Sequence, residues 1–80
     1  MYLATLEHGT DLYKGKGETA IEALQNLNID YTQVKLKGTV KLQKGELKSE
    51  RFMYKLPLRR FIANKMARIQ LAKYMEQLLK

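Results

Sequence analysis

The residues of this sequence that point most clearly to chemistry are its lysines and arginines, and the chemistry they indicate is anion binding. Lys35, Lys37 and Lys41 alternate with apolar residues, so a strand would place all three on one face. Arg51 and Lys55 would continue that basic face on the partner strand of a hairpin. A row of positive charges on a pleated face can neutralise successive phosphates.

A second basic set follows in the C-terminal part of the chain. Arg60, Asn64 and Arg68 are spaced four residues apart, which places them in one row on an unbroken helix. Arg59 and Lys65 lie beside this row. Arginine suits phosphates because its guanidinium donates in a bidentate geometry, and asparagine can donate or accept. Such a row is also common on a solvated helix face, so two interpretations stay open.

The charge is distributed unequally along the chain. The 80 residues contain 15 Lys and Arg against 8 Asp and Glu, a formal net charge of +7. Residues 1–30 have two lysines and five carboxylates, a net charge of −3, whereas residues 31–80 have thirteen basic and three acidic residues, a net charge of +10. Lys14 and Lys16 belong to the acidic part and are not assigned to the binding set. This asymmetry indicates an anionic partner, either nucleic acid or an acidic protein surface.

The sequence offers few residues that could carry out catalysis or bind a metal ion. The chain has no Cys and only one His and one Ser, which argues against a thiolate site or a catalytic triad. His8 adjoins Gly9, and we expect it in a solvated turn. The carboxylates fall mostly in expected turns and on polar faces. We therefore expect no enzyme activity, no catalytic residues, no metal site and no cofactor.

A glycine pattern lies between the second expected strand and the first expected helix. Gly15, Gly17 and Ala20 match the spacing of a dinucleotide-binding turn. That site needs a second parallel strand ending in an acidic residue, whereas a lysine-rich hairpin follows here. We interpret the glycines as the turn from a strand into a helix that Thr19 caps. The same opening, from Gly17 through Thr19 into a helix, resembles the start of HicB-like antitoxin domains over a short stretch, and we infer no function from it.

The elements that must position these side chains form a single α+β domain over residues 1–80, of order ββαββα. The mostly antiparallel sheet carries both helices on one face. An acidic ββα unit covers about residues 1–30 and a basic ββα unit about residues 31–80. The expected elements are strands at 2–7, 12–16, 34–42 and 47–56, and helices at 20–28 and 58–79.

The fourth strand is the one with the least regular pattern. We expect Phe52, Tyr54 and Leu56 to face the core, with a bulge or twist near Ser49 because Leu47 is out of phase. Single-stranded nucleic acid would need exposed aromatic rings beside the charge. The candidates are Tyr13, Tyr31, Tyr54 and Tyr74, most of which we interpret as core or core-edge residues.

The end of the last helix is apolar on more than one side. Leu71, Tyr74, Met75 and Leu78 cover a wide arc, which two helices and a small sheet would leave partly uncovered. An apolar patch on a small basic domain indicates a partner surface, so we expect a homodimer or a larger assembly through this helix.

The function that these patterns favour is non-enzymatic binding of DNA or RNA through the basic second unit. The alternative is a small protein–protein interaction module, either a subunit of an assembly or an inhibitor that docks on an acidic surface. No leader and no run of about 18 apolar residues is present, so we expect a cytoplasmic protein without a membrane span.

Overall fold

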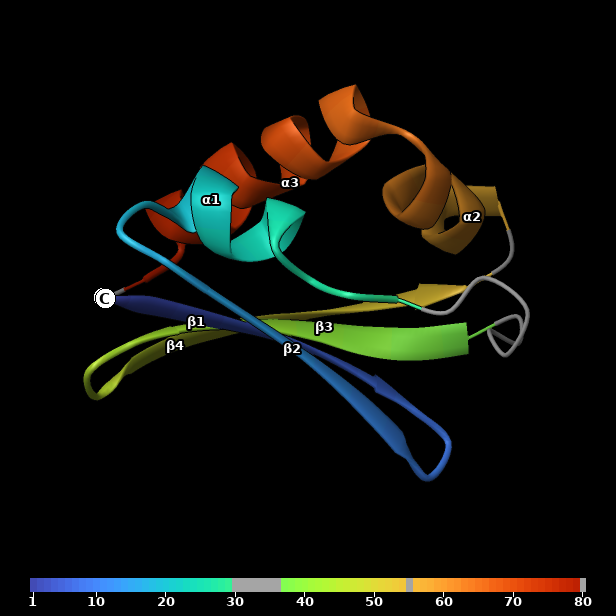
Figure 1. Cartoon of the computed structure of the whole chain (residues 1–80), viewed down its shortest axis with the longest axis horizontal. Coiled ribbons are helices and arrows are strands. Elements are labelled where there is room, and N and C mark those ends of the chain that lie inside the picture. Colours follow the sequence, from blue (N-terminus) through green and yellow to red (C-terminus); the bar gives the residue numbers. More distant parts are fainter. Residues whose placement is uncertain (30–36, 55, 80) are drawn as a thin grey trace.

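The computed structural model describes residues 1–29, 37–54 and 56–79, which form one sheet covered by helices on one face (Figure 1). The elements, in chain order, are β1 (Tyr2–His8), β2 (Asp11–Gly17), α1 (Ala20–Gln25), β3 (Lys37–Lys44), β4 (Leu47–Tyr54), α2 (Leu56–Ala63) and α3 (Lys65–Gln77). The expected α+β class and the ββαββ order are confirmed. The last helix is divided in two.

The four strands are antiparallel throughout and lie in the order β2-β1-β3-β4. β1 and β3 therefore occupy the centre, and the hairpin from the acidic part joins the hairpin from the basic part in one sheet. Gly9 and Gly45 stand at φ +62° and +61° in the two hairpin turns, a backbone region that glycine enters without a steric cost.

Gly15 and Gly17 lie inside β2, where they let the backbone of α1 approach the strand. A Cβ atom on Gly15 would lie 2.5 Å from the carbonyl oxygen of Ala23, and one on Gly17 would lie 2.6 Å from the amide nitrogen of Ala23. The glycine spacing thus serves helix–strand packing rather than the turn into the helix. That turn is fixed by Thr19, whose hydroxyl accepts a hydrogen bond from the Glu22 amide at 3.1 Å.

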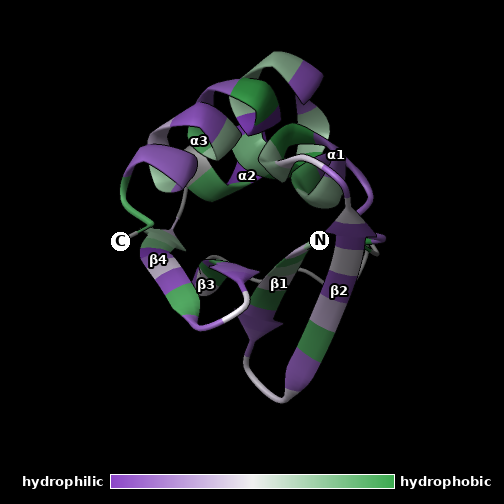
Figure 2. Ribbon diagram, turned by 90° about the vertical axis from the view of Figure 1, so that its left-hand side faces the viewer, coloured by the Kyte–Doolittle hydropathy of each residue, from purple (hydrophilic) through white to green (hydrophobic). Residues whose placement is uncertain are grey.

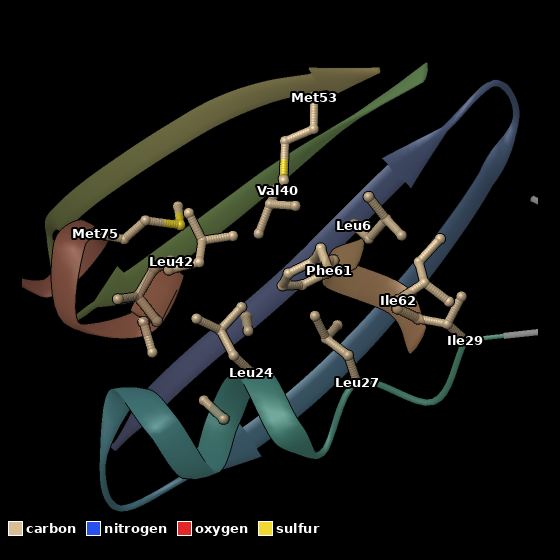
Figure 3. Packing of buried hydrophobic residues seen from close by; sticks show 14 of the residues in the cluster. Leu6, Leu24, Leu27, Ile29, Val40, Leu42, Met53, Phe61, Ile62 and Met75 are labelled. Carbon is tan, nitrogen blue, oxygen red and sulfur yellow. The ribbon is translucent and has the colours of Figure 1, made fainter. Parts of the chain in front are cut away.

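The core lies between the sheet and the helices. Figure 3 shows Leu6, Val40 and Leu42 of the central strands facing Leu24 of α1 and Phe61 of α2. All five are essentially inaccessible to solvent. The apolar residues of the central strands alternate with polar ones, as the sequence predicts for a sheet with one covered face.

The helix expected over 58–79 is broken at Asn64. The Asn64 amide closes the last turn of α2 by donating to the Arg60 carbonyl at 2.9 Å. Its own backbone is extended, and its side chain accepts from the Met66 amide at 2.9 Å, so Asn64 caps the start of α3. Asparagine is a preferred residue at this position, and it ends one helix and begins the next without Gly or Pro.

The expected face of β4 is wrong. Its pairing with β3 runs without a bulge from Tyr54 to Leu47, and the side chains that point to the core are those of Ser49 and Met53. Phe52 and Tyr54 point to the opposite side and are exposed. Ser49 can face the core because its hydroxyl donates to the Met75 carbonyl at 3.0 Å. Since side chains alternate along a strand, this single shift reverses the expected faces of Phe52 and Tyr54. The strand expected to reach Leu56 ends at Tyr54, and Leu56 belongs to α2.

Candidate nucleic-acid interface

The face of the sheet opposite the helices, here called the outer face, is not covered by any described element (Figure 2). The register places lysines of β2, β3 and β4 on this face. The register places Lys37 and Lys41 of β3 there, as the sequence predicts for a strand. The remaining outward-facing residues of the described strands are Leu3, Thr5, Glu7, Leu12, Lys14, Lys16, Thr39, Gln43, Lys48, Glu50, Phe52 and Tyr54. On this described part of the face, five lysines stand against two glutamates.

Lys14 and Lys16 are the unexpected members of this set. They lie in the acidic part of the chain, yet β2 pairs with β1 so that both point to the outer face. Lys48 of β4 faces the same side, opposite Gln43 of β3. Charge counted along the sequence misses this grouping, because the sheet order brings segments of opposite average charge onto one surface.

Lys41 is held by an ion pair at the middle of the outer face. Its ammonium lies 2.8 Å from Glu7 Oε1 on the neighbouring strand, and Glu50 is directly opposite it on β4. The hydrogen bond to Glu7, and then the charge of that carboxylate, raise the pKa of Lys41 above its ordinary value, with a smaller contribution from Glu50. Lys41 is thus charged but already partnered.

Two aromatic rings lie side by side on the outer face of β4. The ring centroids of Phe52 and Tyr54 are 5.8 Å apart and their planes are inclined by 33°. Phe52 is 60% exposed and Tyr54 is 53% exposed. Across the ladder they pair with Thr39 and Lys37, so a cationic side chain borders the aromatic pair.

Two shallow hollows mark this face. One, of about 290 Å³, is lined by Glu7, Gly9, Lys37, Gly38, Thr39 and Phe52. The other, of about 300 Å³, lies over the middle of the sheet and includes Leu12, Lys41, Gln43 and Lys48 among its lining residues. The outer face is therefore an open, slightly hollowed platform.

The basic helix set is dispersed in the structure. Arg59 and Arg60 are exposed on α2 and Lys65 is exposed at the start of α3. Asn64 caps α3, so it does not continue a helical row. The expected row of Arg60, Asn64 and Arg68 is wrong, because α2 and α3 are separate helices. Lys35 and Lys55 lie outside the described residues.

Arg68 is buried and serves as a structural clamp between helices. Only 8% of the residue is exposed. Its guanidinium donates to carbonyls at the end of α1 and in the last turn of α2, which are those of Leu24, Gln25, Leu27, Phe61 and Ile62, at 2.9–3.3 Å. A cation is favourable there, since helix C-termini carry partial negative charge. The expected phosphate contact by Arg68 is therefore wrong.

Arg51 also leaves the expected basic face. It lies opposite Val40 on the helix side of β4, where its guanidinium stacks over the Tyr74 ring at 5.2 Å from the centroid.

The four C-terminal residues expected to form a partner surface are divided between the core and the surface. Leu71 and Met75 belong to the core, whereas Tyr74 and Leu78 are each 46% exposed. Self-association through α3 stays a prediction, now limited to those two side chains.

The environment of His8 differs most from what the sequence predicts. It is buried at the end of β1 instead of solvated in the turn, and its Nδ1 lies 3.9 Å from an Asp11 carboxylate oxygen.

Within residues 1–29, 37–54 and 56–79, no group of three His, Asp or Glu side chains is arranged to hold a metal ion. No helix in the same ranges is long and apolar enough to cross a membrane.

Comparison of the chain with protein-family models, with curated proteins and with solved structures gave no match. The site therefore has to be interpreted from its own chemistry.

The residues that sequence reasoning missed are Phe52, Lys14, Lys16 and Lys48. No local pattern in the sequence places Phe52 on the outer face, because the residues of β4 that face the helices are Ser49, Arg51 and Met53, and only Met53 among them is apolar. Two aromatic residues in one strand favoured the opposite phase. The grouping of the lysines depends on strand order, which no local pattern of these segments contains.

Proposed function

We propose that this protein is a non-enzymatic nucleic-acid-binding protein that contacts phosphates through the outer face of its sheet. The observation that carries the proposal is the gathering of five lysines from β2, β3 and β4 on one open face. Because Lys41 is paired with Glu7, the other four lysines, Lys14, Lys16, Lys37 and Lys48, are those we assign to phosphates.

The outer face supports this function better than the helix surface does. Arg59 and Arg60 belong to the helical layer on the other side of the sheet, as Figure 1 shows for α2, so one strand of nucleic acid lying on the lysines would not meet them. The distribution of charge along the chain predicts binding through both the lysines and the helix arginines, whereas the fold puts the two sets on opposite sides of the sheet. We therefore assign binding to the lysines and treat the arginine pair as the competing surface.

The test is fluorescence anisotropy of a labelled oligonucleotide over a series of salt concentrations. Each phosphate contact on a single strand contributes about −0.7 to the slope of log affinity against log salt, so four lysines predict a slope of about −3. Replacing Lys37 and Lys48 together by Ala should weaken binding and bring the slope to about −1.5. Replacing Arg59 and Arg60 together by Ala removes the same charge and should leave the slope unchanged.

Glu7→Gln is the complementary variant. It removes a carboxylate from the outer face and releases Lys41 from its ion pair, so both affinity and salt slope should increase. If the arginine pair lowers affinity more than the lysine pair does, the binding surface is wrong. If no oligonucleotide binds at low salt, the proposal fails, and the charge has to be assigned to an acidic protein partner.

A further inference from the structure

We infer that the nucleic acid bound by the outer face is single-stranded, and that Phe52 and Tyr54 form a platform on which its bases stack. This inference rests on the proposed function and adds the substrate class to it. The juxtaposition that carries it is an exposed aromatic pair bordered by a lysine, on a face that is otherwise open.

The exposure of the two rings is the first step. Phe52 and Tyr54 are more than half exposed, although β4 has an inner face on which side chains can be buried. Two large aromatic residues left in water forgo the free energy that burial would contribute, and a neighbouring pair of this kind marks an interaction surface. Their centroids, 5.8 Å apart and inclined by 33°, offer neighbouring π-faces rather than one closed stack.

The surroundings of the rings favour a base as the group that covers them. Lys37 is directly opposite Tyr54 on the ladder, and Thr39 is opposite Phe52, so each ring has a cationic or polar neighbour on the same face. A hollow of about 290 Å³ adjoins Phe52, with Gly9 and Gly38 in its lining. A base stacked on a ring with its phosphate at Lys37 uses both features, whereas an apolar peptide would use only the rings.

The strandedness follows from what each form of nucleic acid exposes. In a duplex the base faces are stacked on one another, so it would offer only phosphates to this surface and leave both rings uncovered. A single strand exposes base faces and phosphates together, at a spacing that lets aromatic and cationic side chains of one sheet contact both. The platform therefore selects the single-stranded form.

The test compares labelled mixed-sequence DNA and RNA single strands with a DNA duplex of the same length by fluorescence anisotropy. Phe52→Ala and Tyr54→Ala should each weaken single-strand binding about tenfold and leave duplex binding within about twofold. Phe52→Tyr retains a π-face and should bind nearly as the wild type does. Because both rings are exposed, the far-UV circular dichroism spectrum and the melting temperature should change little.

A second readout reports the contact itself. The chain contains no tryptophan, so Phe52→Trp introduces a single indole, whose emission a stacked base should quench. Tyr74→Trp is the matched control, since Tyr74 is also about half exposed but lies on α3, away from the outer face. Its emission should not change on adding the same oligonucleotide.

The outcomes separate this inference from the proposed function. If Lys37→Ala weakens binding while Phe52→Ala and Tyr54→Ala do not, the stacking platform is wrong and phosphate binding by the outer face stands. Duplex binding tighter than single-strand binding would also overturn the inference alone. Absence of binding to every oligonucleotide at low salt would overturn both.

Discussion

Replacing Arg68 should destabilise the fold far more than replacing any exposed arginine, because its guanidinium joins two helix ends. The side chain donates to carbonyls of Leu24, Gln25 and Leu27 at the end of α1. It also donates to those of Phe61 and Ile62 in α2. Arg68→Met keeps the apolar stem in α3 but leaves these carbonyls without their cationic donor.

The magnitude follows from the contacts. A hydrogen bond to a charged group contributes about 1.5–3 kcal/mol net, and five such bonds are not additive because the released carbonyls find water or shift. A buried acceptor left without a donor costs about 1–3 kcal/mol, and with two helix ends each losing their donor we expect a total loss of about 3–5 kcal/mol. Chains of this length have a total stability of only about 4–12 kcal/mol, so Arg68→Met would be marginally folded at best.

Urea denaturation followed by far-UV circular dichroism measures this loss. Arg68→Lys should lose less stability than Arg68→Met, because the lysine ammonium keeps the positive charge. It should still lose some, because one ammonium cannot reach both helix ends. Arg60→Met, on the exposed side of α2, is the matched control and should stay within about 0.5 kcal/mol of the wild type. An Arg68→Met variant within about 1 kcal/mol of the wild type would refute the clamp.

Two further predictions concern packing. Gly15→Ala should destabilise the protein by about 2 kcal/mol in the same urea assay, because the new Cβ would meet backbone atoms of Ala23 and Leu27 at 2.5–2.6 Å; an unchanged midpoint would contradict the close approach of α1 to β2. Leu71→Glu should abolish the cooperative thermal transition because it places a carboxylate in the core, whereas Leu78→Glu should leave the transition nearly unchanged. Equal melting temperatures for these two variants would contradict the placement of α3.

The elements with a regular pattern are predictable from this sequence, and the surface they create is much less so. The alternation around Val40 and Leu42 identifies β3 and its inward face correctly, because each apolar residue there is buried. On β4 the burial of Ser49 depends on a hydrogen bond to the Met75 carbonyl, a residue far along the chain. No local pattern reports that bond, so hydrophobicity assigned Phe52 and Tyr54 to the wrong face.

The candidate site shows the same division between local and long-range causes. Lys37 and Lys41 were predicted on one face because the strand pleat alone decides it. The sequence predicts Arg68 to contact phosphates because no local pattern reports its burial. That burial depends on the break at Asn64 and on carbonyls of α1, which lies more than forty residues earlier. Asparagine in a long helical pattern was the local signal for that break.

The measurement that tests the central claim most directly is a heteronuclear NMR titration of the labelled protein with a short single-stranded oligonucleotide. The outer-face account predicts that the largest amide shifts fall on β3 and β4, around Lys37, Thr39, Phe52 and Tyr54, with smaller shifts at Lys14 and Lys16 and little change in α1 and α3. Shifts concentrated on α2 and α3, with the β3 and β4 amides unmoved, would contradict it.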